Sequence, residues 1–518
     1  MGGDQTKLTG PDLASGIAET DLAAGSSVLG HAGGEAVLLV RDGADVVAVG
    51  ATCSHYGGPL AEGVVVDGAV RCPWHHACFE LRTGAALRAP ALNPIDCYDV
   101  QRAGGRIRVG AKKAVAAAAA PSAAPRTIAI IGAGAAGEAA ATTLRREGYA
   151  GDIKLFGADE APPVDRPNLS KDYLAGTAPE EWLPLRPDGY FEEQRIELAL
   201  GAAGRVASLS IKERQLKLAD GGSVAWDALL LATGAEPIRL SVPGGDLPHV
   251  RTLRTLADSR ALIAQASGAR RAVVVGASFI GMEAAASLRA RGVEVHVVGP
   301  EALPFAKILG PEVGAFLQSL HEENGVVFHL GQTVAAVDAR HATLSGGDDL
   351  EADLIVVGIG VRPSIALAEG AGLSIDRGVL VDERLETSAK GVYAAGDIAR
   401  YPYAPTGEKV RIEHWAVAQR MGRVAALNML GRKVAFTSAP FFWTAQHGVQ
   451  VSYVGHAESW DHADLHGSLA ARDATIAYRR AGKTLAVATV GRDGVSLAAE
   501  LALERGDEAA LEAFGKTR

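Results

Sequence analysis

The sequence TIAIIGAGAAG, residues 127–137, decides the fold of most of the chain. An apolar run, Thr127 to Ile131, predicts a buried strand, and an Ala-rich helix is expected to follow through Arg146. Between them lies a G-x-G-x-x-G turn, in which Gly132 makes the bend, Gly134 lets a pyrophosphate approach the backbone and Gly137 packs helix on strand. The N-terminus of that helix favours the charge of a phosphate. The stretch therefore predicts a dinucleotide-binding βα unit.

A second copy, RAVVVGASFIG, occupies residues 271–281 and predicts a strand from Arg271 to Val275 and a helix to about Arg291. Gly276 and Gly281 keep the first and third glycines, whereas Ser278 stands where the middle glycine is expected. One such turn is weak evidence, but two that each link a strand to a helix predict two parallel sheets covered by helices.

Acidic residues follow the second strand of each unit. Asp159 or Glu160 comes after Ile153 to Phe156, and Glu301 comes after Val293 to Val298, so each can accept hydrogen bonds from a ribose. No arginine stands beside Glu301 to bind a 2′-phosphate. The second site is therefore expected to prefer NADH, with NADPH left open.

Two short loops nearer the N-terminus, CSH at 53–55 and CPWH at 72–75, each combine a thiolate with an imidazole. This mixture is what a Rieske [2Fe–2S] cluster requires, with Cys53 and Cys72 on one iron and His55 and His75 on the other. Zinc is the competing interpretation, but zinc fingers usually separate the Cys pair from the His pair. We therefore predict a Rieske cluster.

The loops resemble those of Rieske ferredoxins rather than those of high-potential Rieske proteins. Gly58 and Trp74 stand where the latter carry an extra Cys, and Ala77 and Phe79 replace a Ser and a Tyr that donate hydrogen bonds. Fewer hydrogen-bond donors near the cluster predict a reduction potential in the lower part of the Rieske range of roughly −150 to +300 mV. A redox titration that gave a strongly positive value would contradict this.

The remaining cysteines, Cys78 and Cys97, are expected to be small, buried and reduced, and no Cys follows Cys97.

The chain has 518 residues, of which 48% are hydrophobic, so it can form several domains with sizeable cores. A net charge of −9 argues against binding to nucleic acid or to an anionic membrane. We see neither a transmembrane segment nor a secretory signal, and we expect a cytoplasmic protein. Residues 1–6 fit the loose myristoylation pattern, but an acid takes the place of a polybasic patch.

Five motifs further along the chain resemble the family of putidaredoxin reductase, ring-hydroxylating-dioxygenase ferredoxin reductases and apoptosis-inducing factor. They are PPVDRPNLSK at 162–171, ATG at 232–234, GVYAAGD at 391–397, EHW at 413–415 and PFFW at 440–443. With the Cys/His loops included, the whole chain resembles Rieske-fused, apoptosis-inducing-factor-like NAD(P)H reductases. The resemblance implies an all-β Rieske domain, an α/β flavoprotein with two dinucleotide-binding domains, and a C-terminal α+β domain.

The expected boundaries follow from the motifs and from changes in composition. They are 1–110 for the Rieske domain, 111–126 for an Ala/Pro-rich linker, 127–246 and 369–434 for the two parts of the FAD-binding domain, 247–368 for the NAD(H)-binding domain and 435–518 for the C-terminal domain.

The resemblance also implies roles for single residues. FAD lies on the first glycine turn, with Asp397 on the ribityl chain and Lys171 near the flavin N5, where a cation stabilises developing negative charge. Phe279 and Glu283 correspond to an aromatic gate and an acid beside the nicotinamide, although Glu283 also suits a helix N-terminus. Trp443 corresponds to a tryptophan between flavin and iron–sulfur partner, although an ordinary core aromatic would look the same. Other residues expected to line the cofactor sites are Ala136, Arg166, Thr233, Gly234, Ile280, Gly360, Gly396, Glu413, His414 and Trp415.

Related disulfide reductases need a Cys beside the flavin, and this chain has none there. We therefore expect electrons to pass from NADH to FAD, then singly to the cluster, and on to an oxygenase, a cytochrome P450 or another electron carrier. Direct reduction of a small molecule, a reverse flow toward NAD and an NADH-sensing regulatory role remain open, and so does the choice between monomer and homodimer.

Overall fold

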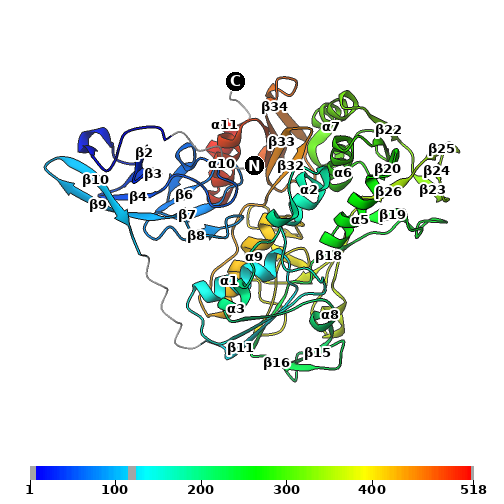
Figure 1. The fold of residues 1–518 in the computed structure, drawn as a ribbon, viewed down its shortest axis with the longest axis horizontal. Coiled ribbons are helices and arrows are strands. Elements are labelled where there is room, and N and C mark those ends of the chain that lie inside the picture. The colour runs from blue at the N-terminus through cyan, green and yellow to red at the C-terminus, as the bar shows by residue number, and fades with distance from the viewer. Residues whose placement is uncertain (1–7, 115–123, 515–518) are drawn as a thin grey trace.

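The computed structural model describes residues 8–114 and 124–514. The N-terminal β domain, the two dinucleotide-binding domains and the C-terminal domain are all visible in Figure 1. Residues 115–123 of the expected linker and the myristoylation pattern at residues 1–6 lie outside the described part. The described helices include none with the length and apolar character that a membrane span requires.

The N-terminal β domain consists of two antiparallel sheets. The six-stranded sheet has the order β1-β10-β9-β4-β3-β2, and the four-stranded sheet has the order β5-β6-β7-β8. The strands of the first are β1 (Ile17–Ala18), β2 (Ser27–Ala32), β3 (Glu35–Asp42), β4 (Asp45–Gly50), β9 (Cys97–Ala103) and β10 (Arg106–Lys112). Those of the second are β5 (Val64–Val66), β6 (Ala69–Arg71), β7 (Cys78–Glu80) and β8 (Ala86–Arg88). The two Cys/His loops follow β4 and β6, and all four cysteines are buried, as expected for Cys78 and Cys97.

The first dinucleotide-binding domain contains a parallel sheet in the order β13-β12-β11-β17-β29. Its strands are β11 (Thr127–Ile131), β12 (Asp152–Phe156), β13 (Ile196–Ala199), β17 (Ala228–Leu231) and β29 (Val392–Ala394). Helix α1 (Ala135–Arg146) follows the first glycine turn and packs closely along α9 (Trp415–Met429). An added Cβ at Gly422 of α9 would lie 2.0 Å from the carbonyl oxygen of Ala136, so the two helices touch through backbone.

The second dinucleotide-binding domain repeats this plan in the order β19-β26-β20-β21-β22. Its strands are β19 (Val250–Thr252), β20 (Arg271–Val275), β21 (Glu294–Gly299), β22 (Val326–Leu330) and β26 (Leu354–Val357), and its main helices are α5 (Leu256–Ala266), α6 (Phe279–Ala290) and α7 (Ala306–Glu323). The strands and helices predicted around both glycine turns are thus confirmed. Two small antiparallel sheets flank these domains, β14 (Val206–Ser210) to β16 (Ser223–Ala225) and β23 (Val334–Val337) to β25 (Asp349–Glu351).

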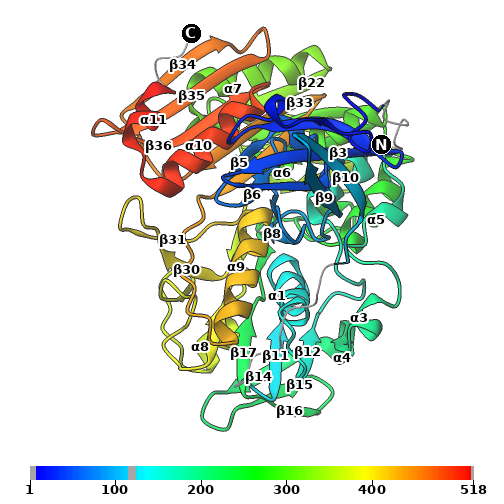
Figure 2. The ribbon, with the colours of Figure 1, turned by 90° about the vertical axis from the view of Figure 1, so that its left-hand side faces the viewer.

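The C-terminal domain is an antiparallel sheet in the order β32-β33-β36-β35-β34 with two helices. Its elements are β32 (Phe441–Gln446), β33 (Val449–Gly455), β34 (His462–Ser468), β35 (Asp473–Arg480), β36 (Lys483–Val490), α10 (Asp493–Arg505) and α11 (Glu508–Ala513). Helix α10 lies beside the N-terminal β domain in both ribbon views, so segments more than 400 residues apart in the sequence meet there (Figures 1 and 2). This arrangement confirms the predicted fold classes of all the domains.

Candidate functional site

A cavity of about 1390 Å³ joins the two glycine turns at the carboxyl ends of both parallel sheets, the edge where such sheets bind ligands. All of the residues predicted for the FAD and nicotinamide sites line it, except Gly137 and Gly281. These two glycines instead pack helix on strand. An added Cβ would lie 1.8 Å from the carbonyl oxygen of Gly132 in one case and 2.0 Å from that of Gly276 in the other.

The first glycine of each turn adopts a backbone conformation that side chains disfavour. Gly132 has φ 114° and Gly276 has φ 112°, in the region that only glycine enters readily. An added Cβ at Gly132 would lie 2.0 Å from the carbonyl oxygen of Ala232, and one at Gly276 would lie 2.4 Å from that of Gly358. Any side chain at either position would therefore push the turn away from the neighbouring strand end.

We expect Gly132→Ala and Gly276→Ala to separate the two nucleotide sites. The first should abolish retention of bound FAD, whereas the second should keep FAD and weaken NADH binding by about tenfold or more, because each turn is expected to hold one pyrophosphate. Flavin absorbance after gel filtration and NADH titration of the purified protein measure the two effects. Gly268→Ala is the control, since an added Cβ there meets no atom within 4 Å. Loss of FAD from Gly276→Ala alone would contradict the assignment.

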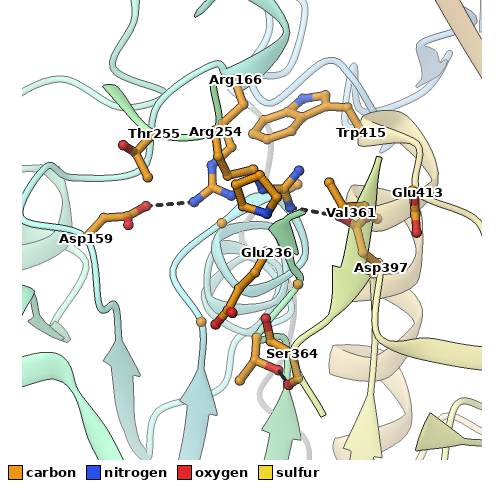
Figure 3. Close-up of a pocket in the computed structure, with 18 of the residues that line it drawn as sticks. Asp159, Arg166, Glu236, Arg254, Thr255, Val361, Ser364, Asp397, Glu413 and Trp415 are labelled. Carbon is orange, nitrogen blue, oxygen red and sulfur yellow. Dashed lines mark hydrogen bonds and ion pairs between the residues drawn. The ribbon is translucent and has the colours of Figure 1, made fainter. Parts of the chain in front are cut away.

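Two ion pairs lie across the part of the cavity next to the first glycine turn. Arg166 Nη2 lies 2.7 Å from Asp159 Oδ2, and Arg254 Nη2 lies 2.8 Å from Asp397 Oδ2. Figure 3 shows the two arginines side by side between the two aspartates. Arg254 was not predicted, because no local motif marks it and its partner is 143 residues away. The arginines could neutralise a pyrophosphate, and the acids could accept hydrogen bonds from sugar or ribityl hydroxyls.

Two residues that line the cavity, Arg254 and His414, also carry buried polar atoms without a hydrogen-bond partner. His414 Nδ1 and Arg254 Nε are buried and have no hydrogen-bond partner within the protein. Burial lowers the pKa of His414 to about 3, so its imidazole is neutral near pH 7 and can donate or accept one hydrogen bond. A glycine cradle and two arginines paired with acids in one cavity fit a flavin dinucleotide.

Lys171 and Glu283 form an ion pair where the two nucleotide domains meet. Lys171 Nζ lies 2.8 Å from Glu283 Oε2, and Glu283 is only 3% exposed. Ser170 Oγ and Thr444 Oγ donate to the same carboxylate at 2.6 and 2.7 Å. Glu283 therefore does more than complement the N-terminus of α6. It connects the PPVDRPNLSK motif, α6 and β32, and fixes the Lys171 ammonium beside the cavity.

Strand β32 has two functional faces because successive side chains point to opposite sides. On one face, the Trp443 ring centroid lies 4.5 Å from that of His75, and Phe441 stacks on His76 at 4.0 Å. On the other face, Phe442 lies 4.8 Å from Phe279, and Thr444 bonds Glu283. Trp443 also lines the cavity, so one side chain contacts both the cavity and the second Cys/His loop.

The two Cys/His loops bring the four predicted ligands together as two pairs. Cys53 and Cys72 are 3% and 1% exposed and lie within hydrogen-bonding reach of each other. His55 Nδ1 lies 3.2 Å from His75 Nδ1. Burial lowers the pKa of His55 to about 4 and that of His75 well below its ordinary value, so both imidazoles are in the neutral form that binds metal.

Backbone amides surround the sulfur pair. The amides of His55 and Tyr56 point to Cys53, and those of Trp74 and His75 point to Cys72. An added Cβ at Gly58 would lie 2.6 Å from Cys72 Sγ, so this glycine keeps the loops close. Within residues 8–114 and 124–514, no three His, Cys, Asp or Glu side chains gather around one ion position. A thiol pair, an imidazole pair and amides aimed at sulfur fit a two-iron cluster with split ligation.

A buried charge cluster attaches the N-terminal β domain to the rest of the chain, and we name it the Glu500 cluster. Glu500 on α10 is fully buried, and its carboxylate lies 2.7 Å from Arg420 Nη1 and 3.0 Å from Arg88 Nη1. Glu504 adds contacts to Arg88 at 2.7 Å and to Arg71 at 2.9 Å. Although burial raises the pKa of Glu500, Arg420 and Arg88 hold it well below its ordinary value. A carboxylate on α10 thus binds strands β6 and β8 of the other domain.

Comparison with protein families agrees with this geometry. Residues 126–422 match the pyridine nucleotide-disulphide oxidoreductase family, residues 16–99 match the Rieske [2Fe-2S] domain and residues 441–517 match the reductase C-terminal domain. The chain therefore belongs to the pyridine nucleotide-disulphide oxidoreductases. Fold and site together define a Rieske-containing, FAD- and NAD(P)H-dependent oxidoreductase of the ferredoxin reductase type, and the Rieske match excludes the zinc alternative.

Some relatives align with most of this chain, and others align with its reductase part. Human apoptosis-inducing factor 3 is 36% identical over an alignment of 480 residues, which covers 89% of this chain and 78% of that protein. Rhodocoxin reductase of Rhodococcus erythropolis is 37% identical over 66% of this chain and 81% of its own length. The crystal structure of the covalent putidaredoxin reductase–putidaredoxin complex matches with a TM-score of 0.71 at 32% identity, covering 76% of this chain and all of that chain.

Proposed function

We propose that the protein passes electrons from NADH through FAD to its own Rieske cluster and from there to a separate electron acceptor. The observation that carries this proposal is the position of Trp443, which lines the nucleotide cavity and packs 4.5 Å from the His75 ring. The predicted cluster ligands are therefore adjacent to the cavity without a second protein. Bound FAD accepts a hydride and releases electrons one at a time, which joins a two-electron donor to a one-electron cluster.

The residues around the cavity have separable roles in this proposal. The Lys171 ammonium supplies positive charge at the flavin, and Glu283 holds that ammonium in place through their 2.8 Å contact. Phe279 packs between Phe305 and Phe442 at centroid distances of 5.0 and 4.8 Å, which suits an aromatic wall that the nicotinamide displaces or stacks against. Asp397, which pairs with Arg254, would accept hydrogen bonds from the ribityl hydroxyls of bound FAD.

The nicotinamide site is proposed to prefer NADH. Glu301 lines the cavity just beyond β21, where an adenosine ribose lies in this class of domain. A carboxylate there accepts hydrogen bonds from both ribose hydroxyls and repels a 2′-phosphate. No basic side chain occurs within two residues of Glu301 in the sequence.

The acceptor is proposed to be an oxygenase, a cytochrome P450 or another one-electron carrier. Support comes from the relatives, whose names include rhodocoxin reductase and the ferredoxin reductase component of an anthranilate 1,2-dioxygenase system. These relatives cover the reductase part of this chain. Here the Rieske domain occupies the side of β32 that carries Trp443.

Anaerobic stopped-flow mixing with NADH tests the proposal. We expect flavin absorbance to bleach first and the reduced-cluster EPR signal to appear afterwards in samples frozen at increasing times. Bleaching without any cluster signal would refute internal transfer. Slow reoxidation by every one-electron acceptor, together with an NADH-dependent change in oligomer size, would favour an NADH-sensing role.

A further inference from the structure

The two residues that flank His55 in the first Cys/His loop, Ser54 and Tyr56, both connect this loop to the reductase part of the chain. Neither is a predicted cluster ligand, and neither lines the large cavity. Their hydrogen bonds lead in different directions, one toward the start of α1 and the other toward the PPVDRPNLSK motif. The residues immediately before and after His55 are therefore both fixed by hydrogen bonds.

The Ser54 connection is a chain of three hydrogen bonds. Ser54 Oγ donates to the carbonyl oxygen of Asn93 at 2.5 Å, and Arg186 Nη1 donates to the side-chain oxygen of Asn93 at 2.9 Å. Arg186 Nε also donates to Glu138 Oε1 at 2.7 Å. Glu138 is fully buried in the first turns of α1, directly after the glycine turn at 132–137, and Arg186 is 8% exposed. A buried ion pair thus joins the cluster loop to the helix that begins at the first nucleotide site.

The Tyr56 connection is shorter. Its hydroxyl donates to Asp165 Oδ2, and Asp165 is 9% exposed and precedes Arg166, which lines the cavity. The Tyr56 ring lies 4.0 Å from the His55 ring, centroid to centroid, at an interplanar angle of 36°. Tyr56 keeps 49% of its surface exposed, so its position depends on the hydroxyl contact and on the imidazole rather than on burial.

The Glu500 cluster cannot supply the same constraint. It attaches strands β6 and β8 and His76, which directly follows His75, and so it holds the body of the Rieske domain and the end of the second Cys/His loop. Hydrogen bonds to charged groups are worth more than neutral ones and impose direction as well as distance. In the loop at 53–57, Tyr56 donates directly to the Asp165 carboxyl group, whereas Ser54 reaches the Arg186–Glu138 ion pair through Asn93.

We propose that Ser54 and Tyr56 are positioning residues for electron transfer, which orient the imidazole edge of the cluster toward Trp443 by tying the first Cys/His loop to Asn93–Arg186–Glu138 and to Asp165. The inference rests on the proposed function, because it concerns the step from flavin to cluster. It predicts that this step depends on two hydroxyl groups that contact neither nucleotide.

The test is Tyr56→Phe, which removes the hydroxyl and keeps the ring beside His55. We expect NADH to bleach the flavin at the wild-type rate, whereas the rate at which the cluster EPR signal appears falls about tenfold, because the loop loses its direct hydrogen bond to the PPVDRPNLSK motif. Asp165→Asn keeps an acceptor oxygen for the hydroxyl and should stay close to wild type. Ser54→Ala should also slow the transfer, and the double variant should be slower than either.

Tyr98→Phe is the matched control, because it removes a buried hydroxyl that donates to Glu35 at 2.6 Å within the same domain. It should leave the transfer rate unchanged. Hydrogen exchange of the intact protein gives a readout besides turnover, and peptides covering 54–58 and 183–189 should lose protection in Ser54→Ala and Tyr56→Phe only.

Three results would overturn the inference while leaving the proposed function standing. They are a wild-type transfer rate in Tyr56→Phe, an equal loss in Tyr98→Phe, and a slower rate explained entirely by a changed midpoint potential of the cluster. A wild-type protein whose cluster never accepts electrons would instead refute the proposed function itself.

Discussion

Replacement of Cys53 by alanine should abolish NADH-dependent reduction of one-electron acceptors and leave NADH-dependent bleaching of the flavin intact. Cys53 is one of two buried thiols that face each other between the loops, and backbone amides aim at its sulfur. Loss of one thiolate removes one of the two protein ligands of one iron, so the cluster should not assemble. The nucleotide cavity lies in other domains and keeps all of its lining residues.

The matched control is Cys97→Ala, since Cys97 is as buried as Cys53, at 3% exposure, and belongs to neither loop. Iron content, the EPR signal of the reduced cluster and cytochrome c reduction are measured for both variants. The control should retain all three. Acceptor reduction at the wild-type rate by Cys53→Ala protein that lacks iron would show that electrons leave directly from the flavin.

The second large effect is expected at Glu500, where replacement by alanine should destabilise the docked Rieske domain. Removal of the carboxylate leaves Arg420 buried without its ion-pair partner at 2.7 Å. It also deprives Arg88 of one of its two carboxylate partners. Breaking a buried ion pair from one side costs about 3–5 kcal/mol, because the remaining charge stays desolvated. Thermal unfolding followed by tryptophan fluorescence, together with protease sensitivity of residues 8–114, measures the loss.

Glu508→Ala is the control for this change, because Glu508 is exposed and its 3.2 Å contact with Lys483 is at the surface. Such surface ion pairs contribute about 0–1 kcal/mol to stability.

The pH dependence of stability provides an independent check on the role of Glu500. The pKa of Glu500 in the folded protein lies well below its ordinary value of 4.5, so its stabilisation is full above that pH and is lost as the solution is acidified toward the folded value. Equal stability of Glu500→Ala and wild type at pH 7 would contradict the assigned role.

Local sequence signals were sufficient for the secondary structure around the nucleotide sites and for the ligand loops. Strands β11 and β20 have the predicted bounds, because a short apolar run followed by a glycine turn leaves few alternatives. The same turns predicted why Gly137 and Gly281 are glycines, and the structure places both against backbone. These features depend on neighbouring residues, which a sequence motif records directly.

Contacts between distant segments could not be predicted in this way. Arg254 meets Asp397 from a loop without a motif, and Arg71 meets Glu504 across 433 residues. Glu283 was expected beside a nicotinamide, but its three hydrogen-bond partners, Lys171, Ser170 and Thr444, became visible only in the fold. Such pairings depend on how whole domains pack, and charge patterns along a single sequence do not encode them.

The alternation of side chains along β32 has a consequence for how this architecture can be recombined. Phe441 and Trp443 meet the Rieske domain, while Phe442 and Thr444 meet helix α6, so this short segment contacts two neighbouring domains at once. Deleting or inserting one residue before it would exchange the two faces. A chimaera that takes its C-terminal domain from a reductase without a Rieske domain would inherit a strand whose outer face has no fused domain to pack against. Functional hybrids should therefore exchange this strand and the Rieske domain together.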